Sequence, residues 1–322
     1  MNPFEQILSF ADRCIVSERG RVHEGGIHCP HEVYRFLSEV RVDLPPYTAS
    51  TIDEHLCQIR RIRRLLIGLQ HDCSRLTARS EFDMAACYSA AILDLGRIFR
   101  RGGLVLDLLV SIGIARSAIG SVRKIRRRLS PSARRVVIDA AERIERDCDP
   151  LEVVLDRDHQ WEIANSDVEE SWVIHRSTLV SEKEPVTLSQ SHGDALVAQM
   201  MKEFLDQPQS ARDQTHTAQF YCSLALVRLL KTDLAIRSFQ QDRMCCLERL
   251  EDLLECYLNE VPIDPFTSEP FCYRRIGLDD FALYSVGPCR VDHGGTFGGW
   301  HDVIDGNADL CLDMGDYDFS CQ

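Results

Sequence analysis

Residues 261–288 read VPIDPFTSEPFCYRRIGLDDFALYSVGP, and here the sequence changes from helical spacing to prolines and short aromatic runs. Pro262, Pro265 and Pro270 cannot continue a helix, because proline lacks the backbone N–H and fixes φ. FCYRRI (271–276) and FALYSV (281–286) are aromatic and apolar runs separated by GLDD, a spacing that predicts a β-hairpin. Two strands alone are marginal in water, so the hairpin is expected to lie on the preceding long helix.

Upstream of this stretch, apolar residues recur with helical spacing. Thr51 and Glu54 match a capping box, Ser80 precedes a helical run that Gly102-Gly103 ends, and Ser130-Pro131 fits a helix start. A long helix is expected over about 215–240 and a shorter one near 242–258. Because the connections are short, the predicted fold class is mainly α, with antiparallel helical hairpins or an array and a small C-terminal β-hairpin module.

The pattern divides the chain into four regions. Residues 1–175 are expected to form a helical domain, 176–195 a linker or exposed loop, 196–260 a helical segment, and 261–322 the hairpin with an acidic tail. Within 103–122, small residues recur three or four positions apart and predict a face that another helix can approach closely: Gly113, Ser117, Gly120 and Ser121.

Charge is unevenly distributed along the 322 residues. The formal net charge is −13, with +5 on residues 1–150 and −18 on the remainder. Arginine and lysine residues cluster at 60–64 and 123–128. Nucleic-acid binding would favour aromatic residues between them, and neither cluster contains any. These clusters are expected to pair with the acidic half or to form a solvated face, and no nucleic-acid partner is predicted.

The 14 cysteines are scattered without a CxxC motif, which favours a reducing compartment and a cytoplasmic location. The first residues lack the basic and apolar regions of a signal peptide. Residues 103–122 are apolar enough to suggest a membrane span, but Asp107 and Arg116 make insertion unfavourable. A core helix without membrane insertion is therefore expected there.

Enzyme motifs such as GxSxG, HExxH, the P-loop and GxGxxG do not occur in the sequence. His159 stands near Asp158 and Glu162, but helical spacing displaces it from both, so a polar helix surface is the favoured interpretation. Another cluster offers zinc-type ligands without a standard spacing, and an ordinary polar loop is favoured for it: His23, His28, Cys29 and His31.

The acidic tail suggests a calcium site. DGNADLCLDMGD (305–316) sets oxygen ligands at positions 1, 3, 5 and 12 of a calcium loop, with position 9 reaching the ion through water. The residues are Asp305, Asn307, Asp309, Asp316 and, at position 9, Asp313. Position 6 is Leu310 rather than glycine, and position 12 is not glutamate. A flexible acidic tail is the alternative.

Two resemblances follow from specific residues. The order of helix, proline-bearing loop and hairpin ending in LYSxG resembles the C-terminal half of the major pseudopilins of type II secretion, which implies a calcium site in that loop; the residues that carry it are Pro262, Asp264, Pro265, Tyr273, Leu283, Tyr284, Ser285, Gly287 and Gly294-Gly295. No leader or apolar helix of the pseudopilin kind occurs at 1–30. Residues 95–114, 149–162 and 261–275 resemble a family of long helical proteins of unknown function that is frequent in planctomycete bacteria.

Two classes of function remain open from the sequence. The first is a non-enzymatic interaction or scaffold protein whose C-terminal module stabilises the fold or docks a protein partner. The alternative is an unrecognised enzyme with its site in a cleft between helices, and a deep pocket lined by titratable groups would favour it.

Overall fold

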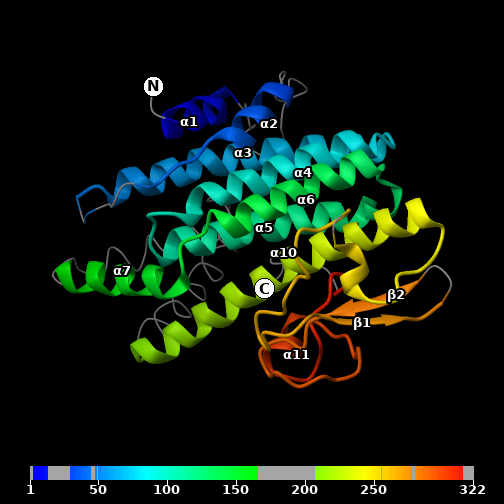
Figure 1. Ribbon diagram of the computed structural model, residues 1–322. Helices are drawn as coiled ribbons and strands as arrows, with labels where there is room; N and C mark the ends of the chain where they lie inside the picture. The colour runs from blue at the N-terminus through cyan, green and yellow to red at the C-terminus, as the bar shows by residue number, and fades with distance from the viewer. Residues whose placement is uncertain are drawn as a thin grey trace, which may run out of the picture.

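The computed structural model describes residues 3–13, 30–44, 48, 50–165, 207–254, 256–277 and 280–314. The expected linker at 176–195 and the side chains of the zinc-type cluster lie outside these residues. Within them, the chain is mainly helical with one small two-stranded sheet, so the predicted fold class is confirmed (Figure 1).

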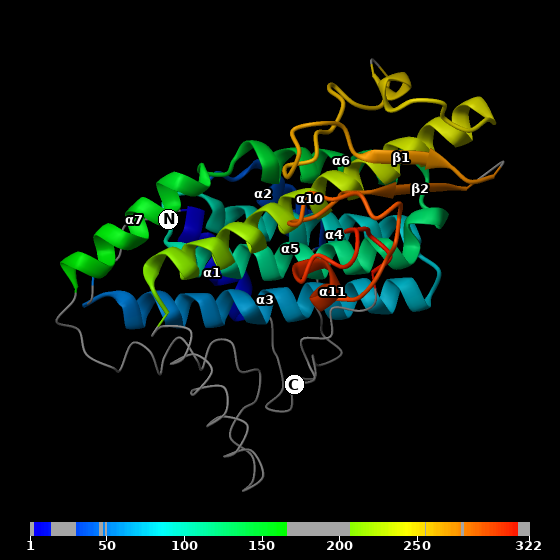
Figure 2. The same cartoon turned by 90° about the horizontal axis from the view of Figure 1, so that it is seen from below.

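The helices of the first half form a bundle. They are α1 (Pro3–Arg13), α2 (Pro30–Glu39), α3 (Ile52–Ala78), α4 (Phe82–Arg97), α5 (Val105–Ile125), α6 (Pro131–Arg146) and α7 (Leu151–Ala164), with 3-10 turns η1 (Ile98–Arg100) and η2 (Arg126–Arg128). In the second half, α10 (Gln209–Arg243) packs on α5 and α6. Figure 2 shows α10 lying across these two helices, with the β-hairpin beside its C-terminal half.

Helix α4 is the centre of the bundle and contacts α2, α3, α5 and α6. Small side chains allow this close packing, because Ala85, Ala86, Ala90 and Ala91 are all buried. Near its C-terminus, a Cβ added to Gly96 would lie 3.3 Å from the Ser111 carbonyl oxygen and 3.3 Å from Ile114 on α5. Gly96 therefore allows α4 and α5 to approach closely.

In α5, the small residues that pack closely against other helices are not the predicted glycines. Gly113 and Gly120 have open space where a Cβ would lie, and Gly113 is exposed, so none of the described residues packs tightly at either glycine. The helix buries Ala115 and Ala118 instead. With the turn after it, α5 is long and apolar enough to span a membrane by length and composition, and 61% of its most apolar window is buried within the protein.

Two of the predicted helix starts need comment. Ser130 accepts a hydrogen bond from the Ala133 N–H at 3.2 Å, which confirms the predicted cap of α6. Ser80, in contrast, has a left-handed backbone (φ 63°) and lies before the cap residue Glu81.

The predicted helix near 242–258 is wrong. Met244 is left-handed (φ 53°) and ends α10 directly after Arg243, and the chain then forms only a 3-10 turn, η3 (Leu250–Leu253). The physical reason is the left-handed backbone at Met244, which redirects the chain out of the helix.

The C-terminal module, residues 261–322, contains the predicted hairpin. Strand β1 (Cys272–Arg275) pairs antiparallel with β2 (Phe281–Tyr284), with Tyr273 opposite Leu283. The Tyr273 hydroxyl donates to the Leu247 carbonyl at 2.8 Å, and the guanidinium of Arg237 on α10 lies 5.2 Å from the Phe281 ring. The expectation that the hairpin lies on the long helix is therefore met.

The remainder of the module folds back on the hairpin. Ser285 and Leu310 exchange two backbone hydrogen bonds of 2.9 Å, and a short helix, α11 (Trp300–Ile304), lies between them in sequence. One apolar core runs from Phe4 in α1 to Met314, so the bundle and the module share their buried surface.

Buried ion pairs join the bundle helices. Asp94 on α4 is fully buried and accepts two hydrogen bonds from Arg143 on α6, at 2.8 and 2.7 Å. Arg97 lies 3.3 Å from the same carboxylate and 2.7 Å from Asp147, and it also donates to the carbonyls of Leu37 in α2 and of Val40 just after it. Three helices and the turn after α6 thus meet at one charged cluster.

Candidate functional site

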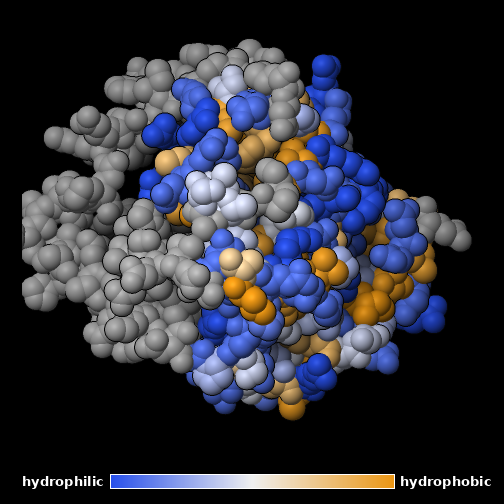
Figure 3. Space-filling view, turned by 90° about the vertical axis from the view of Figure 1, so that its left-hand side faces the viewer, coloured by the Kyte–Doolittle hydropathy of each residue, from blue (hydrophilic) through white to orange (hydrophobic). Residues whose placement is uncertain are grey.

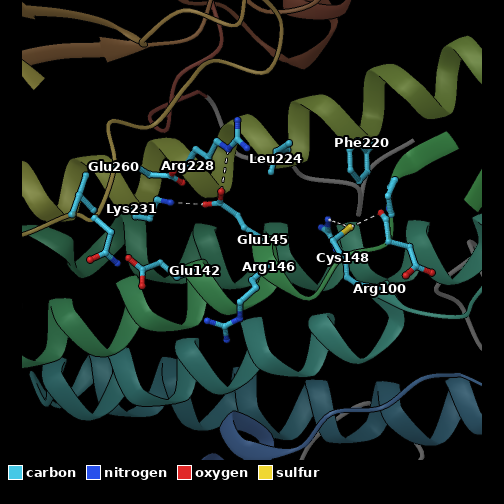
Figure 4. A pocket seen from close by; sticks show the side chains of 14 residues that line it. Arg100, Glu142, Glu145, Arg146, Cys148, Phe220, Leu224, Arg228, Lys231 and Glu260 are labelled. Atoms are coloured by element: carbon cyan, nitrogen blue, oxygen red, sulfur yellow. Dashed lines mark hydrogen bonds and ion pairs between the residues drawn. The ribbon is translucent and has the colours of Figure 1, made fainter. Parts of the chain in front are cut away.

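A cavity of about 490 Å³ lies between α6, α10 and the loop at 258–260 (Figure 4). Helix α10 contributes side chains three or four positions apart, which share one face of a helix: Phe220, Leu224, Arg228 and Lys231. Helix α6 contributes Glu142, Glu145 and Arg146, and the turn after it contributes Cys148, Asp149 and Pro150. The cavity is in the size range of small-molecule sites.

The middle of the cavity is an ion-pair network. Glu145 lies 2.9 Å from the Lys231 ammonium and 3.1 Å from Nε of Arg228. Arg228 also donates to the Ile263 carbonyl at 2.7 Å, which connects this wall to the C-terminal module. Lys231 is only 4% exposed, so its charge depends on Glu145 for compensation. These contacts join α6, α10 and the C-terminal module, and they also place charged side chains in the cavity.

The other end of the cavity contains a buried arginine. Arg100 is 4% exposed; its Nε donates to Ser111 Oγ at 2.7 Å and its Nη1 to Cys148 Sγ at 3.6 Å. The Phe220 ring lies 5.9 Å from its guanidinium carbon. Among the described residues, Nη2 of Arg100 has no hydrogen-bond partner, and no carboxylate forms an ion pair with this side chain.

Asp149 beside it is committed to other partners. Its Oδ2 accepts from the Gly102 N–H at 3.0 Å and from Arg157 at 2.8 Å. Burial raises the pKa of Asp149, but the Gly102 and Arg157 hydrogen bonds outweigh burial and hold the pKa below its ordinary value. Asp149 therefore stays ionised and joins the ends of α6 and η1.

The described lining combines four cationic and four acidic side chains but contains no histidine: Arg100, Arg146, Arg228 and Lys231, with Glu142, Glu145, Asp149 and Glu260. Histidine is the side chain whose ordinary pKa lies nearest neutral pH, so the lining lacks the usual proton-transfer group. The arrangement suits recognition of a charged ligand better than acid–base catalysis.

A buried histidine–aspartate pair lies in the core. His55 Nε2 on α3 is 2.6 Å from Asp107 Oδ1 in the first turn of α5, and the two side chains are 7% and 0% exposed. Asp107 Oδ2 also accepts from the Leu104 N–H at 2.9 Å. The pair does not line the cavity, and it holds α3 against the start of α5.

The predicted calcium ligands have separate environments. Asp309 is fully buried and accepts backbone N–H groups from His293, Gly295 and Thr296 at 2.9–3.2 Å, while Asp313 forms two hydrogen bonds with Arg126.

The other predicted ligands that the structure describes do not join the Asp309 carboxylate in one site. Asp305 and Asn307 are exposed, and Asp316 lies outside the described residues. No group of three or more histidine, cysteine or acidic side chains that could hold a metal occurs in the described residues. Calcium binding remains a prediction.

The other charged motifs of the sequence have partners. Arg126 is 5% exposed and lies 3.3 Å from Asp233 and 2.7 Å from Asp313, so this residue of the 123–128 cluster pairs with the acidic half. In the 60–64 cluster, Arg61 instead pairs with Asp12 in the first half of the chain. Asp158 accepts the Val105 N–H at 3.1 Å and Glu162 pairs with Arg212 at 2.8 Å, while His159 is exposed. The exposure of His159 agrees with the polar-surface interpretation of this helix, but Asp158 is buried and holds the start of α5.

Exposed apolar side chains gather on the C-terminal module. Of eight large apolar side chains with high exposure among the described residues, five belong to the module: Ile263, Ile276, Val291, Phe297 and Ile304. Elsewhere, hydrophilic residues cover most of the described surface in the view of Figure 3, and hydrophobic ones form small separate groups.

Sequence reasoning missed Arg100 and Cys148. Arg100 belongs to the polar run RIFRRGG, where solvent exposure is the ordinary expectation, and Cys148 stands in an acidic turn. Their contact joins positions 48 apart, and no local signal indicates it. With this geometry established, the comparisons with known proteins add no relative: no family model, curated protein or solved structure matches the chain.

Proposed function

We propose that the protein is a non-enzymatic helical scaffold of the cytoplasm whose C-terminal module docks a protein partner. The observation that carries the proposal is the concentration of exposed apolar side chains on the module, since such surfaces favour protein contacts. Membership of the planctomycete-type helical family, and the pseudopilin-like character of residues 261–322, belong to the same proposal, as does the absence of a nucleic-acid partner.

The internal pairing of the bundle supports this role. The buried charges at Asp94, Glu145 and Arg126 are engaged within the chain, so they are committed to holding helices in place. Fixed helices provide a rigid platform on which the hairpin and its return segment are presented. Because the module shares the bundle core, a partner bound there would be attached to the whole protein.

A matched pair of substitutions tests the proposal. Phe297 on the module and Val153 on α7 are 48% and 46% exposed, so Phe297→Glu and Val153→Glu add the same charge at similar exposure. The intact protein and both variants would be used to capture partners from the native cell. We expect Phe297→Glu to lose a partner that Val153→Glu retains, with both variants folded by circular dichroism. Equal recovery by all three proteins would refute docking through this surface.

The second candidate function is an enzyme with its site in the α6–α10 cavity, favoured by the mixed charges of its lining. A thermal-shift screen of small metabolites would use the intact protein and Leu224→Trp, which fills the apolar part of the cavity. A compound that stabilises only the unsubstituted protein, and is then chemically converted, would support this candidate. A screen without such a compound would count against it.

A further inference from the structure

Cys148 occupies an unusual position for a cysteine of this protein. It lies in the turn between α6 and α7, is half-buried, and lines the cavity together with Arg100 and Phe220 (Figure 4). Its Sγ donates to the Asp149 carbonyl at 3.2 Å and accepts from Nη1 of Arg100 at 3.6 Å. Among the described cysteines, Cys148 thus has a sulfur that accepts a hydrogen bond from an arginine side chain.

Arg100 gives this thiol an electropositive environment. Arg100 is only 4% exposed, yet the described residues supply its guanidinium with no carboxylate. Asp149 could have been that partner, but its Oδ2 is engaged by Gly102 and Arg157. A buried cation without an anion is unfavourable, and either a cysteine thiolate or a bound anionic group at Nη2 would compensate it.

Among the other cysteines that the structure describes, two buried and three exposed ones lack this combination. Cys222 and Cys311 are buried among apolar groups, and burial raises the pKa of Cys222 to about 12 and that of Cys311 to about 11, so their thiolates are disfavoured. Cys57, Cys245 and Cys256 are exposed, but none of them has a hydrogen bond to a guanidinium. These three provide internal references for simple accessibility.

We propose that Cys148 is a thiol-modification site. It forms a mixed disulfide with one half of a small, carboxylate-bearing disulfide that Arg100 holds in the cavity. The Cys148 sulfur, after losing its proton, attacks one sulfur of the incoming disulfide. A new S–S bond forms while the old one breaks, and the departing half takes up the released proton and leaves as a thiol. Cys148 is oxidised, the departing half is reduced, and no further oxidant is consumed.

The cavity suits such a molecule. Its volume of about 490 Å³ has room for a short peptide-like thiol, Arg100 provides a fork of donors for a carboxylate, and Phe220 and Leu224 offer apolar contact. Modification at Cys148 would place a new group between α6 and α10, where those helices already meet through Glu145 and Lys231.

The test uses the reduced, intact protein and two disulfides of opposite charge. Oxidised glutathione carries carboxylates, whereas cystamine carries ammonium groups. Peptide mass spectrometry would follow modification at Cys148 and at the exposed Cys245. We expect Cys148 to react at least about tenfold faster with oxidised glutathione than with cystamine, after each rate is divided by that at Cys245.

Variants separate the role of Arg100 from mere access. Arg100→Gln should abolish the preference for oxidised glutathione, and Arg100→Lys, which keeps the charge, should retain part of it. Cys245→Ser should leave the Cys148 rates unchanged when Cys57 serves as the reference. If Arg100→Gln does not fold, the contrast between the two disulfides in the unsubstituted protein still decides. Equal normalised rates, or modification confined to Cys57, Cys245 and Cys256, would overturn the proposal.

Discussion

Replacing Asp94 with asparagine should destabilise the protein strongly. The Asp94 carboxylate is fully buried, accepts two hydrogen bonds from Arg143 at 2.8 and 2.7 Å, and lies 3.3 Å from Arg97. Asp94→Asn keeps the shape but removes the negative charge that compensates Arg143. Removing one partner of a buried ion pair costs about 3–5 kcal/mol, because the other charge stays buried. Asparagine keeps some hydrogen bonding, so we expect about 3 kcal/mol.

The matched control is Asp139→Asn, the same chemical change at an exposed ion pair. Asp139 pairs with Arg135 on α6 at 2.6 Å, but the two side chains are 41% and 47% exposed, and an exposed pair contributes about 0–1 kcal/mol. Urea unfolding followed by circular dichroism would give both free energies of unfolding. At Asp94 the thermal midpoint should also fall by at least about 5 °C. Equal unfolding curves for the two variants would refute the reasoning about buried charge.

Three further predictions follow from the same contacts. Deleting residues 261–322 should lower the thermal midpoint and raise the binding of an apolar dye, because the module covers part of α10; unchanged melting would mean that the module is an independent appendage. Burial raises the pKa of Asp147, but Arg97 outweighs burial and holds it below its ordinary value of about 3.9. The stability from this pair is therefore present above about pH 4 and is lost as the pH falls through the lowered pKa. At pH 7, Asp147→Asn should be less stable than the unsubstituted protein, and the difference between their free energies of unfolding in urea should narrow below about pH 4. A difference that stays constant with pH would contradict the pairing. Calorimetric titration of calcium should give heat that Asp305→Ala reduces, and equal heat from both proteins, or none at millimolar calcium, would reject the calcium site.

Helical spacing and caps were enough to predict the class of fold. The Ser130 cap and the β-hairpin both rest on local signals, and the structure contains both. The end of α10 could not be predicted, because Met244 adopts a left-handed backbone that its residue type does not favour. A local pattern cannot reveal a conformation imposed by the surrounding structure.

The charged contacts were still harder to predict. Arg97 reaches Asp147 across 50 positions, and a sequence read segment by segment assigns both residues to the surface. For the predicted calcium ligands, spacing identified the carboxylates but not their use, since Asp309 already accepts three backbone N–H groups. Residue type gives the chemistry that is available, and tertiary packing decides which partner receives it.

The pairing of Arg126 also affects the order in which the chain can be completed during synthesis. Its guanidinium lies beside Asp233 and Asp313, and Asp313 is 187 positions further along the chain. Until the ribosome has made Asp313, α5 and η2 are available but Arg126 lacks one of its anions. Long-range contacts of this kind form late and slow folding. The bundle therefore reaches the electrostatic balance around Arg126 only after Asp313 has left the ribosome.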